Sequence, residues 1–335
     1  MTEEVEKFEQ FIGAHMGCDP ALYMKSYAGL SSFFRARYTQ ELESVDVALV
    51  GVPIDLGLTQ RSGARHGPRE IRAQSANVFY YNPLTKFSPF ELVRVADVGD
   101  VPLRSAFNLA EVIEEIYVYF QGLVAAGVAP VVAGGDHSIS YPIMKALKSQ
   151  TPLGLIHVDS HLDCSGMISN STLHHGTPFS NAGMEGIIDP KRSVHVAIRD
   201  PYMEMETYCH ESGMTVINID QFYDLGVSGV IEEVRRVVGT GPTYISIDID
   251  ALDPAFAPGT GTPVVGGITS YEAKRLLHGL RGLDIVGADV VEVSPPFDSA
   301  GITALAGAQL MFELLCLVAE NVKARPLRPV PGHRW

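Results

Sequence analysis

Three short motifs in this chain carry side chains of the kinds that bind divalent metal ions. The first begins as an apolar, β-prone run at Leu155 and ends with Asp159, His161 and Asp163 at alternate positions. Because successive side chains of an extended chain point to opposite faces, these three ligands share one face of a strand end. A helix would scatter them, since neighbours on a helix lie three or four residues apart. A single Asp-x-His is more often a polar loop than a metal site, so the prediction depends on the other two motifs.

The second and third motifs also follow apolar strands. Asp248 and Asp250 lie two residues apart at the end of one strand, and His137 follows another strand behind Gly134 and Gly135. The two glycines permit a sharp turn from strand to helix that a bulky residue would obstruct. Ligands of open parallel sheets bind beyond the carboxyl ends of the strands, which is where all three motifs fall.

Together the three motifs offer four carboxylates and two imidazoles. Ionised aspartates that are packed together repel one another and raise each other's pKa unless cations intervene. Two divalent ions, with a combined charge of about +4, balance four aspartates and leave room for a bridging hydroxide. Ligation by carboxylate and imidazole without thiolate favours Mn²⁺, with Fe, Co, Ni²⁺ and Zn²⁺ as alternatives. The sequence therefore predicts a binuclear metal site whose ligands are His137, Asp159, His161, Asp163, Asp248 and Asp250.

Strand-like and helical segments alternate along most of the chain. Apolar runs predict strands at 46–52, 93–98, 129–133, 153–158, 193–198, 215–219, 243–249 and 285–293. Helical spacing predicts helices at 109–123, 140–147, 230–238, 270–280 and 304–322, and Pro68 is suited to begin another. This alternation predicts an α/β domain of three layers, with helices on both faces of a mainly parallel sheet of about eight strands.

One domain is expected, because the sequence has no linker, low-complexity segment or internal repeat. It spans residues 41–323, and residues 1–40 are a lead-in that packs on its surface or on a neighbouring subunit. Residues 324–335 form a proline-rich tail, which prolines prevent from being helical. This tail is either free or docked on a neighbouring subunit.

The bulk composition excludes several classes of protein. The 335 residues are 46% hydrophobic and 19% charged, which is typical of globular domains, and the net charge of −14 argues against a nucleic-acid-binding surface. No run of 18 apolar residues predicts a membrane span, and the acidic N-terminus lacks a signal pattern. Four dispersed cysteines indicate free thiols in a reducing compartment, so we expect a cytoplasmic protein.

With these motifs the chain resembles the ureohydrolases, the family of arginase, agmatinase and guanidinobutyrase. The resemblance is carried by Gly-Gly-Asp-His-Ser at 134–138, His-Val-Asp-Ser-His-Leu-Asp at 157–163 and Ser-Ile-Asp-Ile-Asp-Ala-Leu-Asp-Pro at 246–254. It extends from about Val47 to Val318 and is nearest to the guanidinobutyrase and agmatinase branch. Ser160 departs from the family pattern, which usually has alanine there. The resemblance implies an arginase-like fold and a metal-bridging hydroxide that attacks a guanidino carbon and releases urea.

The resemblance also implies roles for two residues outside the metal site. His175 resembles the histidine that gives a proton to the departing amine, and Glu292 resembles the carboxylate that grips the guanidinium. The chemistry agrees, because a planar guanidinium fits a carboxylate and an amine leaves readily only when protonated. The pattern alone does not distinguish His175 from the adjacent His174. We interpret His157 as a core residue or a support for the ligands rather than as a ligand.

The tail of the substrate is less constrained. The loop at 164–173 has no charged residue, which suggests a guanidino compound with a short, neutral or weakly polar tail in contact with Met167 and Ile168. Agmatine would favour a nearby acid, whereas a guanidino acid would favour a base such as Arg61 or Arg65. Free guanidine and biguanides such as metformin are alternative substrates.

Two rival interpretations remain open. Metal-dependent deacetylases share the broad architecture, but their site usually holds one metal ion, and the six ligand positions here favour two. The chain could instead be a structural subunit that supports a homologous active chain in a mixed complex. The resemblance implies a homo-oligomer, a trimer or a hexamer.

Overall fold

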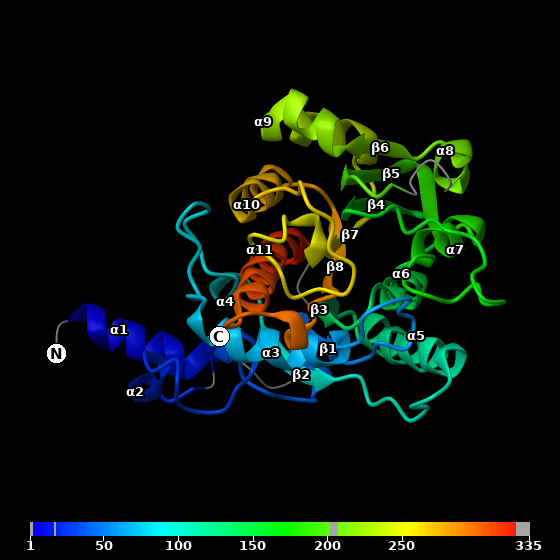
Figure 1. Cartoon of the computed structure of the whole chain (residues 1–335). Coiled ribbons are helices and arrows are strands. Elements are labelled where there is room, and N and C mark those ends of the chain that lie inside the picture. The colour runs from blue at the N-terminus through cyan, green and yellow to red at the C-terminus, as the bar shows by residue number, and fades with distance from the viewer. Residues whose placement is uncertain (1–2, 17, 202–206, 326–335) are drawn as a thin grey trace.

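The computed structural model describes residues 3–16, 18–201 and 207–325. One sheet of eight parallel strands forms its centre, in the order β2-β1-β3-β8-β7-β4-β5-β6 (Figure 1). The strands are β1 (Val47–Val52), β2 (Val95–Asp100), β3 (Ala129–Gly134), β4 (Leu153–Val158), β5 (Ile188–Ile198), β6 (Thr215–Asn218), β7 (Thr243–Asp248) and β8 (Ile285–Val291). The predicted α/β domain with a parallel sheet is confirmed.

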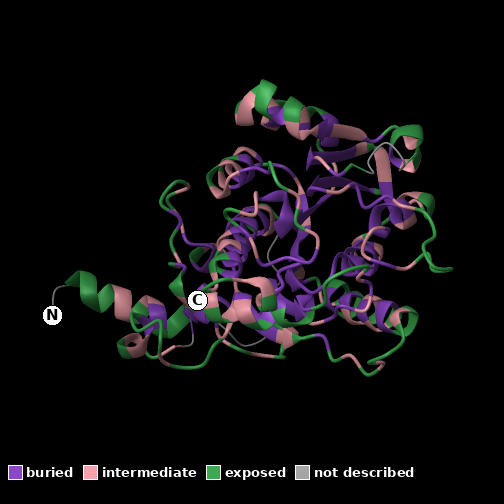
Figure 2. Ribbon diagram, in the orientation of Figure 1, coloured by how far each residue is buried: buried purple, intermediate pink, exposed green. Residues whose placement is uncertain are grey.

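Helices cover both faces of the sheet and bury separate apolar clusters. The helices are α1 (Glu3–Phe11), α2 (Pro20–Tyr23), α3 (Gly67–Gln74), α4 (Pro89–Leu92), α5 (Leu109–Ala125), α6 (Ser140–Leu147), α7 (Pro178–Met184), α8 (Thr207–Ser212), α9 (Ile219–Val238), α10 (Ser270–Gly279) and α11 (Ile302–Ala324). One core cluster lies under α3, α9, α10 and α11, and the other under α5, α6, α7 and α8. Consecutive residues along β1, β4 and β7 are all buried, so both faces of these strands are covered, and Figure 2 shows the centre of the domain in the colour of buried residues.

The helix α11 is the long apolar element of the core. By length and composition it could cross a membrane, but 78% of its most apolar window is buried inside the domain. Its buried side chains, among them Leu310, Leu314 and Val318, pack in the same core cluster as the sheet. We therefore interpret α11 as a core helix, as such burial is typical of one.

Helix α9 differs from its prediction in length. It begins at Ile219 rather than at residue 230, because Asn218 and Gln221 form a capping box at its N-terminus. The cap ends β6 at Asn218, one residue before the predicted end. The helix is interrupted at Gly226, whose φ of 63° is not helical. The prediction that starts at residue 230 therefore contains only the part of the helix after this glycine.

The segment before β1 packs against the domain from which it leads. Helix α1 has no buried residue, but Ile12, Met16, Phe33 and Phe34 are buried in the core cluster that contains α11. The proline-rich tail predicted at 324–335 lies outside the described residues beyond Arg325. The domain boundaries at 41 and 323 stay a prediction.

The strand order decides which motifs meet. Strands β3, β8, β7 and β4 are consecutive neighbours at the centre of the sheet. Because all are parallel, their carboxyl ends lie at one edge, and each is followed there by polar residues. A Cβ atom at Gly135, just past β3, would lie 1.8 Å from the carbonyl oxygen of Ile54. The turn after β3 therefore requires glycine, as the sequence predicts.

Candidate active site

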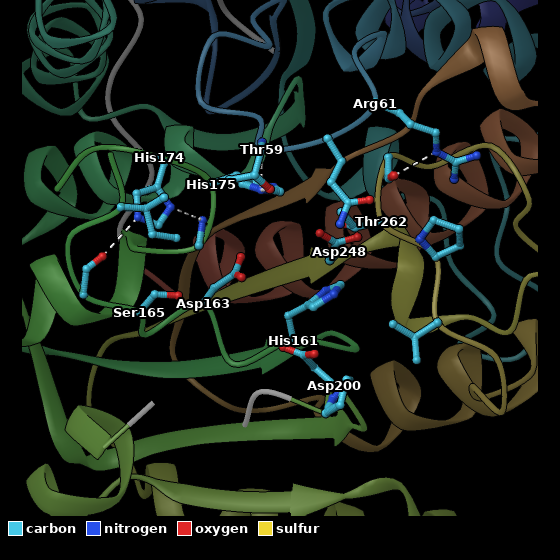
Figure 3. A pocket seen from close by; sticks show the side chains of 18 residues that line it. Thr59, Arg61, His161, Asp163, Ser165, His174, His175, Asp200, Asp248 and Thr262 are labelled. Atoms are coloured by element: carbon cyan, nitrogen blue, oxygen red, sulfur yellow. Dashed lines mark hydrogen bonds between the residues drawn. The ribbon is translucent and has the colours of Figure 1, made fainter. Parts of the chain in front are cut away.

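The six predicted ligands converge beyond the four central strands. His137 follows β3, three ligands follow β4, and Asp248 and Asp250 lie at the end of β7. The Nδ1 atom of His137 lies 2.8 Å from Asp163 Oδ2 and 3.3 Å from Asp159 Oδ2. Figure 3 shows His161 and Asp163, which follow β4, and Asp248, at the end of β7, turned toward one space. Their role as ligands stays a prediction.

Asp159 joins two overlapping groups of donors. Its Oδ2 atom faces His137, and its Oδ1 atom lies 3.4 Å from Nδ1 of His161. His161 Nδ1 also lies 3.2 Å from Asp250 Oδ2, while His137 Nδ1 lies 3.5 Å from Asp248 Oδ2. When metal ions are bound, Asp159 would therefore offer one oxygen to each group of donors. The buried cluster of aspartates and histidines thus fits a binuclear metal site.

The charges of the cluster suit a bound cation. Burial raises the pKa of Asp248 well above its usual range, and the carboxylates of Asp250 and Asp159 raise it further. Burial opposes protonation of His137, but the carboxylates around it raise its pKa well above the ordinary value. His137 Nδ1 is buried and has no aligned hydrogen bond to any described residue. Divalent ions would reduce the repulsion among the aspartate carboxylates and would bind the lone pair of His137 Nδ1.

A chain of hydrogen bonds behind His137 orients its ring. Nε2 of His137 lies 2.8 Å from Ser246 Oγ, and this hydroxyl donates to Asp289 Oδ1 at 2.6 Å. Ser140 and Tyr244 donate to the other oxygen of Asp289 at 2.6 and 2.7 Å. Asp289 is not among the residues predicted from the sequence, although a carboxylate inside a buried strand is a signal that it has polar partners.

Replacing Ser246 by alanine should therefore weaken metal binding without removing a ligand. Outer hydrogen bonds to ligating histidines typically contribute about 10–100-fold to metal affinity. We expect a loss of that size in a metal-activation titration of the apoenzyme. Ser193→Ala is the matched control, because Ser193 is equally buried but its hydroxyl donates to the Asp189 carbonyl oxygen on β5. An unchanged titration curve for Ser246→Ala would contradict this role.

His157 contacts the predicted ligand Asp159 and lies in one group of close donor atoms with it, so its interpretation as a core residue or a support for the ligands stays a prediction. Its Nε2 lies 2.8 Å from Asp159 Oδ2, and its Nδ1 lies 2.8 Å from Nδ1 of His195. Burial lowers the pKa of His157 to about 4, although Asp159 opposes the shift, so the ring is neutral at pH 7.

Ser160, the departure from the family pattern, donates from Oγ to Asp250 Oδ1 at 2.7 Å. This serine therefore holds a predicted ligand in place.

Glu292 and His175 form a pair beside the metal-binding cluster. Glu292 Oε1 accepts a hydrogen bond from the His137 amide at 2.9 Å and lies 3.1 Å from His175 Nδ1. Nε2 of the same ring lies 2.8 Å from Thr59 Oγ1. His174 instead turns its Nε2 toward the Gly166 carbonyl oxygen, at 3.1 Å. The structure thus separates the two adjacent histidines: only His175 contacts Glu292.

The remaining oxygen of Glu292 is the exceptional atom of the site. Oε2 is buried and has no hydrogen-bond partner among the described residues. Glu292 also has a φ of 63°, in the left-handed region that non-glycine residues seldom adopt. Such backbone strain concentrates at functional sites, where the surrounding structure holds it. An unpaired buried carboxylate oxygen implies a donor that arrives with a ligand.

A pocket of about 820 Å³ opens above the cluster. Its lining includes residues of the metal-binding cluster, both adjacent histidines and several residues from the loops after β1, β4, β5 and β7. Ile168 and Arg61 line it, whereas Met167 and Arg65 do not. Met167 is 64% exposed, so its predicted contact with the substrate stays a prediction. Figure 3 shows Arg61 and Asp200 on separate sides of the pocket.

Comparisons with known proteins agree with this geometry. The model of the arginase family matches residues 45–316. A guanidinopropionase from Pseudomonas aeruginosa is 47% identical over 88% of this chain and 93% of its own length. The mitochondrial agmatinase of Gallus gallus is 44% identical over 87% of this chain and 86% of its own. The structure of proclavaminate amidino hydrolase from Streptomyces clavuligerus matches with a TM-score of 0.85 at 37% identity, covering 88% of this chain and 99% of that chain. The chain belongs to the arginase family.

Proposed function

We propose that this chain hydrolyses a small guanidino compound to urea and an amine at a binuclear metal centre. Glu292 Oε2 carries the proposal, because it is buried beside the metal-binding cluster and without a partner among the described residues. A guanidinium is a planar cation with paired N–H donors, and it satisfies such an oxygen with a charge-assisted hydrogen bond. The guanidino carbon would then lie next to the site of the two ions.

The residues of the site account for the steps of this hydrolysis. Two divalent ions held by the six carboxylate and imidazole ligands would supply a water made nucleophilic near neutral pH. Glu292 holds the guanidinium for attack, and its hydrogen bond overcomes the effect of burial to raise the pKa of His175 to about 9. His175 is therefore protonated at pH 7 and gives its proton to the leaving nitrogen as the C–N bond breaks. One water is consumed, and urea and the amine are released.

Replacing His175 by asparagine should lower kcat by roughly 10²–10⁴-fold, the usual contribution of a general acid. Metal content should stay at the wild-type level, because the side chain is not among the six predicted ligands. His174→Asn should cost less than about tenfold, since this ring bonds a backbone carbonyl and does not contact Glu292. Steady-state urea release and elemental analysis of both variants measure the difference. A larger loss in His174→Asn would reverse the assignment.

We further propose a short guanidino acid as the substrate, in place of the neutral or weakly polar tail that the uncharged loop at 164–173 predicts, because a cation also lines the pocket. Arg61 lines the pocket and is anchored by the carbonyl oxygens of Gly261 and Thr260 through Nε and Nη2. The guanidinium also lies over the Phe297 ring, 4.4 Å from its centroid, and Nη1 makes no hydrogen bond to the described residues, so Nη1 is the atom that a carboxylate would meet. The similarity to a guanidinopropionase also supports an acidic tail.

A urea-release assay after reconstitution with Mn²⁺ or Ni²⁺ tests both proposals. The panel is 3-guanidinopropionate, 4-guanidinobutyrate, agmatine, guanidine and metformin. We expect one of the two acids to give the highest kcat/KM. Agmatine as the best substrate would contradict the acidic tail, and guanidine or metformin would favour the alternative substrates. No hydrolysis of any compound with either metal would favour the structural-subunit interpretation.

Three further properties belong to the proposal. Mn²⁺ is the favoured metal, with Ni²⁺ as the main alternative, since the ligands are carboxylates and imidazoles. A homo-oligomer, trimer or hexamer, is supported by apolar side chains exposed near the N-terminal segment, such as Tyr27 (87%) and Leu30 (93%). A cytoplasmic location is supported by four cysteines without a disulfide. Light scattering of the purified protein measures the subunit number.

A further inference from the structure

A second group of metal-binding side chains lies behind the candidate active site, and most of its donor atoms are sulfur. Cys164, His195 and Cys209 each offer one donor atom, and these atoms lie within 4.8 Å of one another. The sulfur of Met214 lies 3.3 Å from His195 Nε2 and 4.0 Å from Cys164 Sγ. All four side chains are buried, with at most 7% exposure. They come from separate segments: the loop after β4, strand β5, helix α8 and the turn before β6.

The hydrogen bonds of two buried histidines fix the tautomer of His195. His157 Nε2 lies against a carboxylate oxygen of Asp159, so this nitrogen carries the proton. The other nitrogen of the neutral His157 ring is then an acceptor, and the His195 Nδ1 atom opposite it, at 2.8 Å, must donate. Neutral His195 consequently has its lone pair on Nε2, the nitrogen beside Met214. The network thus directs the metal-binding nitrogen toward the sulfur atoms.

We propose that Cys164, His195 and Cys209, with the thioether of Met214, bind a third ion, a structural Zn²⁺ that is separate from the active-site pair. Four donors in a tetrahedron at about 2.3 Å from zinc are about 3.8 Å apart. The three donor atoms of Cys164, His195 and Cys209 lie within 4.8 Å of one another, and Met214 Sδ lies 3.3 and 4.0 Å from two of them, so small side-chain shifts would complete the tetrahedron. Two thiolates and a neutral imidazole balance one divalent ion, so the fully buried site carries no net charge.

The two cysteines of this group also suit a metal ion, because the Sγ atoms of Cys164 and Cys209 lie close to a ring nitrogen of His195 inside the domain. Thiolate is the form of cysteine that binds metals. Sulfur-rich and carboxylate-rich groups select different ions, so Zn²⁺ at one site and Mn²⁺ at the other are compatible in one chain.

The position of the group gives the third ion a consequence for the active site. His195 contacts His157, and His157 contacts Asp159, the carboxylate with an oxygen in each group of donors. An ion bound to His195 Nε2 would keep the proton of this ring on its Nδ1 atom. Nδ1 of His157 would then remain an acceptor, and Nε2 of His157 would remain the donor to Asp159. The sulfur group would therefore hold the Asp159 carboxylate in place.

Cd²⁺ titration of the full-length apoenzyme in a reducing buffer tests the proposal. Cd²⁺ replaces Zn²⁺ at thiolate sites and gives a sulfur-to-cadmium charge-transfer absorption, which the active-site cluster cannot give because it contains no sulfur. We expect the absorption in the wild-type protein and its loss in Cys209→Ser. Cys316→Ser is the matched control, because Cys316 is a buried cysteine of α11 outside the group. This control should keep the full absorption.

Two further measurements make the result independent of variant folding and of the proposed activity. Zinc-edge X-ray absorption of the zinc-loaded wild-type protein should contain a Zn–S distance of about 2.3 Å. Asp248→Asn, which disables the active-site cluster, should retain the cadmium–sulfur absorption even where urea release is lost. Absence of both sulfur signals from the wild-type protein would overturn the proposal, as would an undiminished absorption in folded Cys209→Ser.

Discussion

Replacing Asp248 by asparagine is expected to lower kcat/KM for urea release by about 10³-fold or more, equivalent to at least about 4 kcal/mol of transition-state stabilisation. Asparagine keeps the size of the side chain but removes the charge. Asp248 Oδ2 lies 3.5 Å from His137 Nδ1 and is buried among carboxylates whose repulsion a metal ion must offset. Elemental analysis of the same sample should show less bound metal than in the wild-type protein.

Asp253→Asn is the matched control for this variant. Asp253 lies in the same motif, but its carboxylate accepts hydrogen bonds from backbone amides, at 2.9 Å from Ala255 and at 2.7 Å from Gly266. The substitution should cost some stability of the loop and leave metal content unchanged. Wild-type metal content and activity in Asp248→Asn would remove Asp248 from the set of ligands and contradict the binuclear assignment.

Glu292→Gln is expected to have the second large effect, a loss of roughly 10²–10³-fold in kcat/KM, the usual cost of removing one electrostatic contact to the reacting group. The neutral amide would no longer balance the charge of the guanidinium. Metal content should be retained, because Glu292 contacts the amide and not the ring of His137. Steady-state kinetics together with elemental analysis measure the effect.

The same variant should also change the pH dependence. The pKa of His175 is raised to about 9 because Glu292 outweighs burial, so the proton donor is present below that pH and lost as the pH rises through it. Removing the carboxylate lowers this pKa, and the alkaline limb of kcat/KM should move to lower pH. If the alkaline limb of kcat/KM in Glu292→Gln stays at the wild-type pH, a group other than His175 causes it.

Glu313→Gln controls for the removal of a buried carboxylate next to a histidine. Glu313 is 2% exposed and lies 2.8 Å from His278 Nε2, but it belongs to α11 and does not line the pocket. Its loss should lower the melting temperature and leave the alkaline limb at the wild-type position. The comparison separates a specific effect on His175 from a general effect of a disturbed core.

The sequence by itself determined the local features of this protein. The spacing of Asp159, His161 and Asp163 after an apolar run located a strand end, but the structure ends β4 at Val158, so the three side chains lie on the bend beyond it, with Asp163 at a φ of 50°, and not on one face of an extended strand. The alternation of short apolar runs with helical spacing gave the parallel sheet covered on two faces. These features depend on side chains within about one turn or one strand of each other, so the periodicity contains them.

Only the tertiary structure decided how the distant segments combine. The order β3-β8-β7-β4 brings together residues more than a hundred positions apart, such as His137 and Asp248. The tertiary structure also shows that His175, and not His174, contacts Glu292. It shows that Asp289 supports His137 through Ser246, and that Cys164 and Cys209 lie together behind the site. Neighbouring positions in the sequence do not encode these pairings, because they arise from strand order and side-chain packing across the whole sheet.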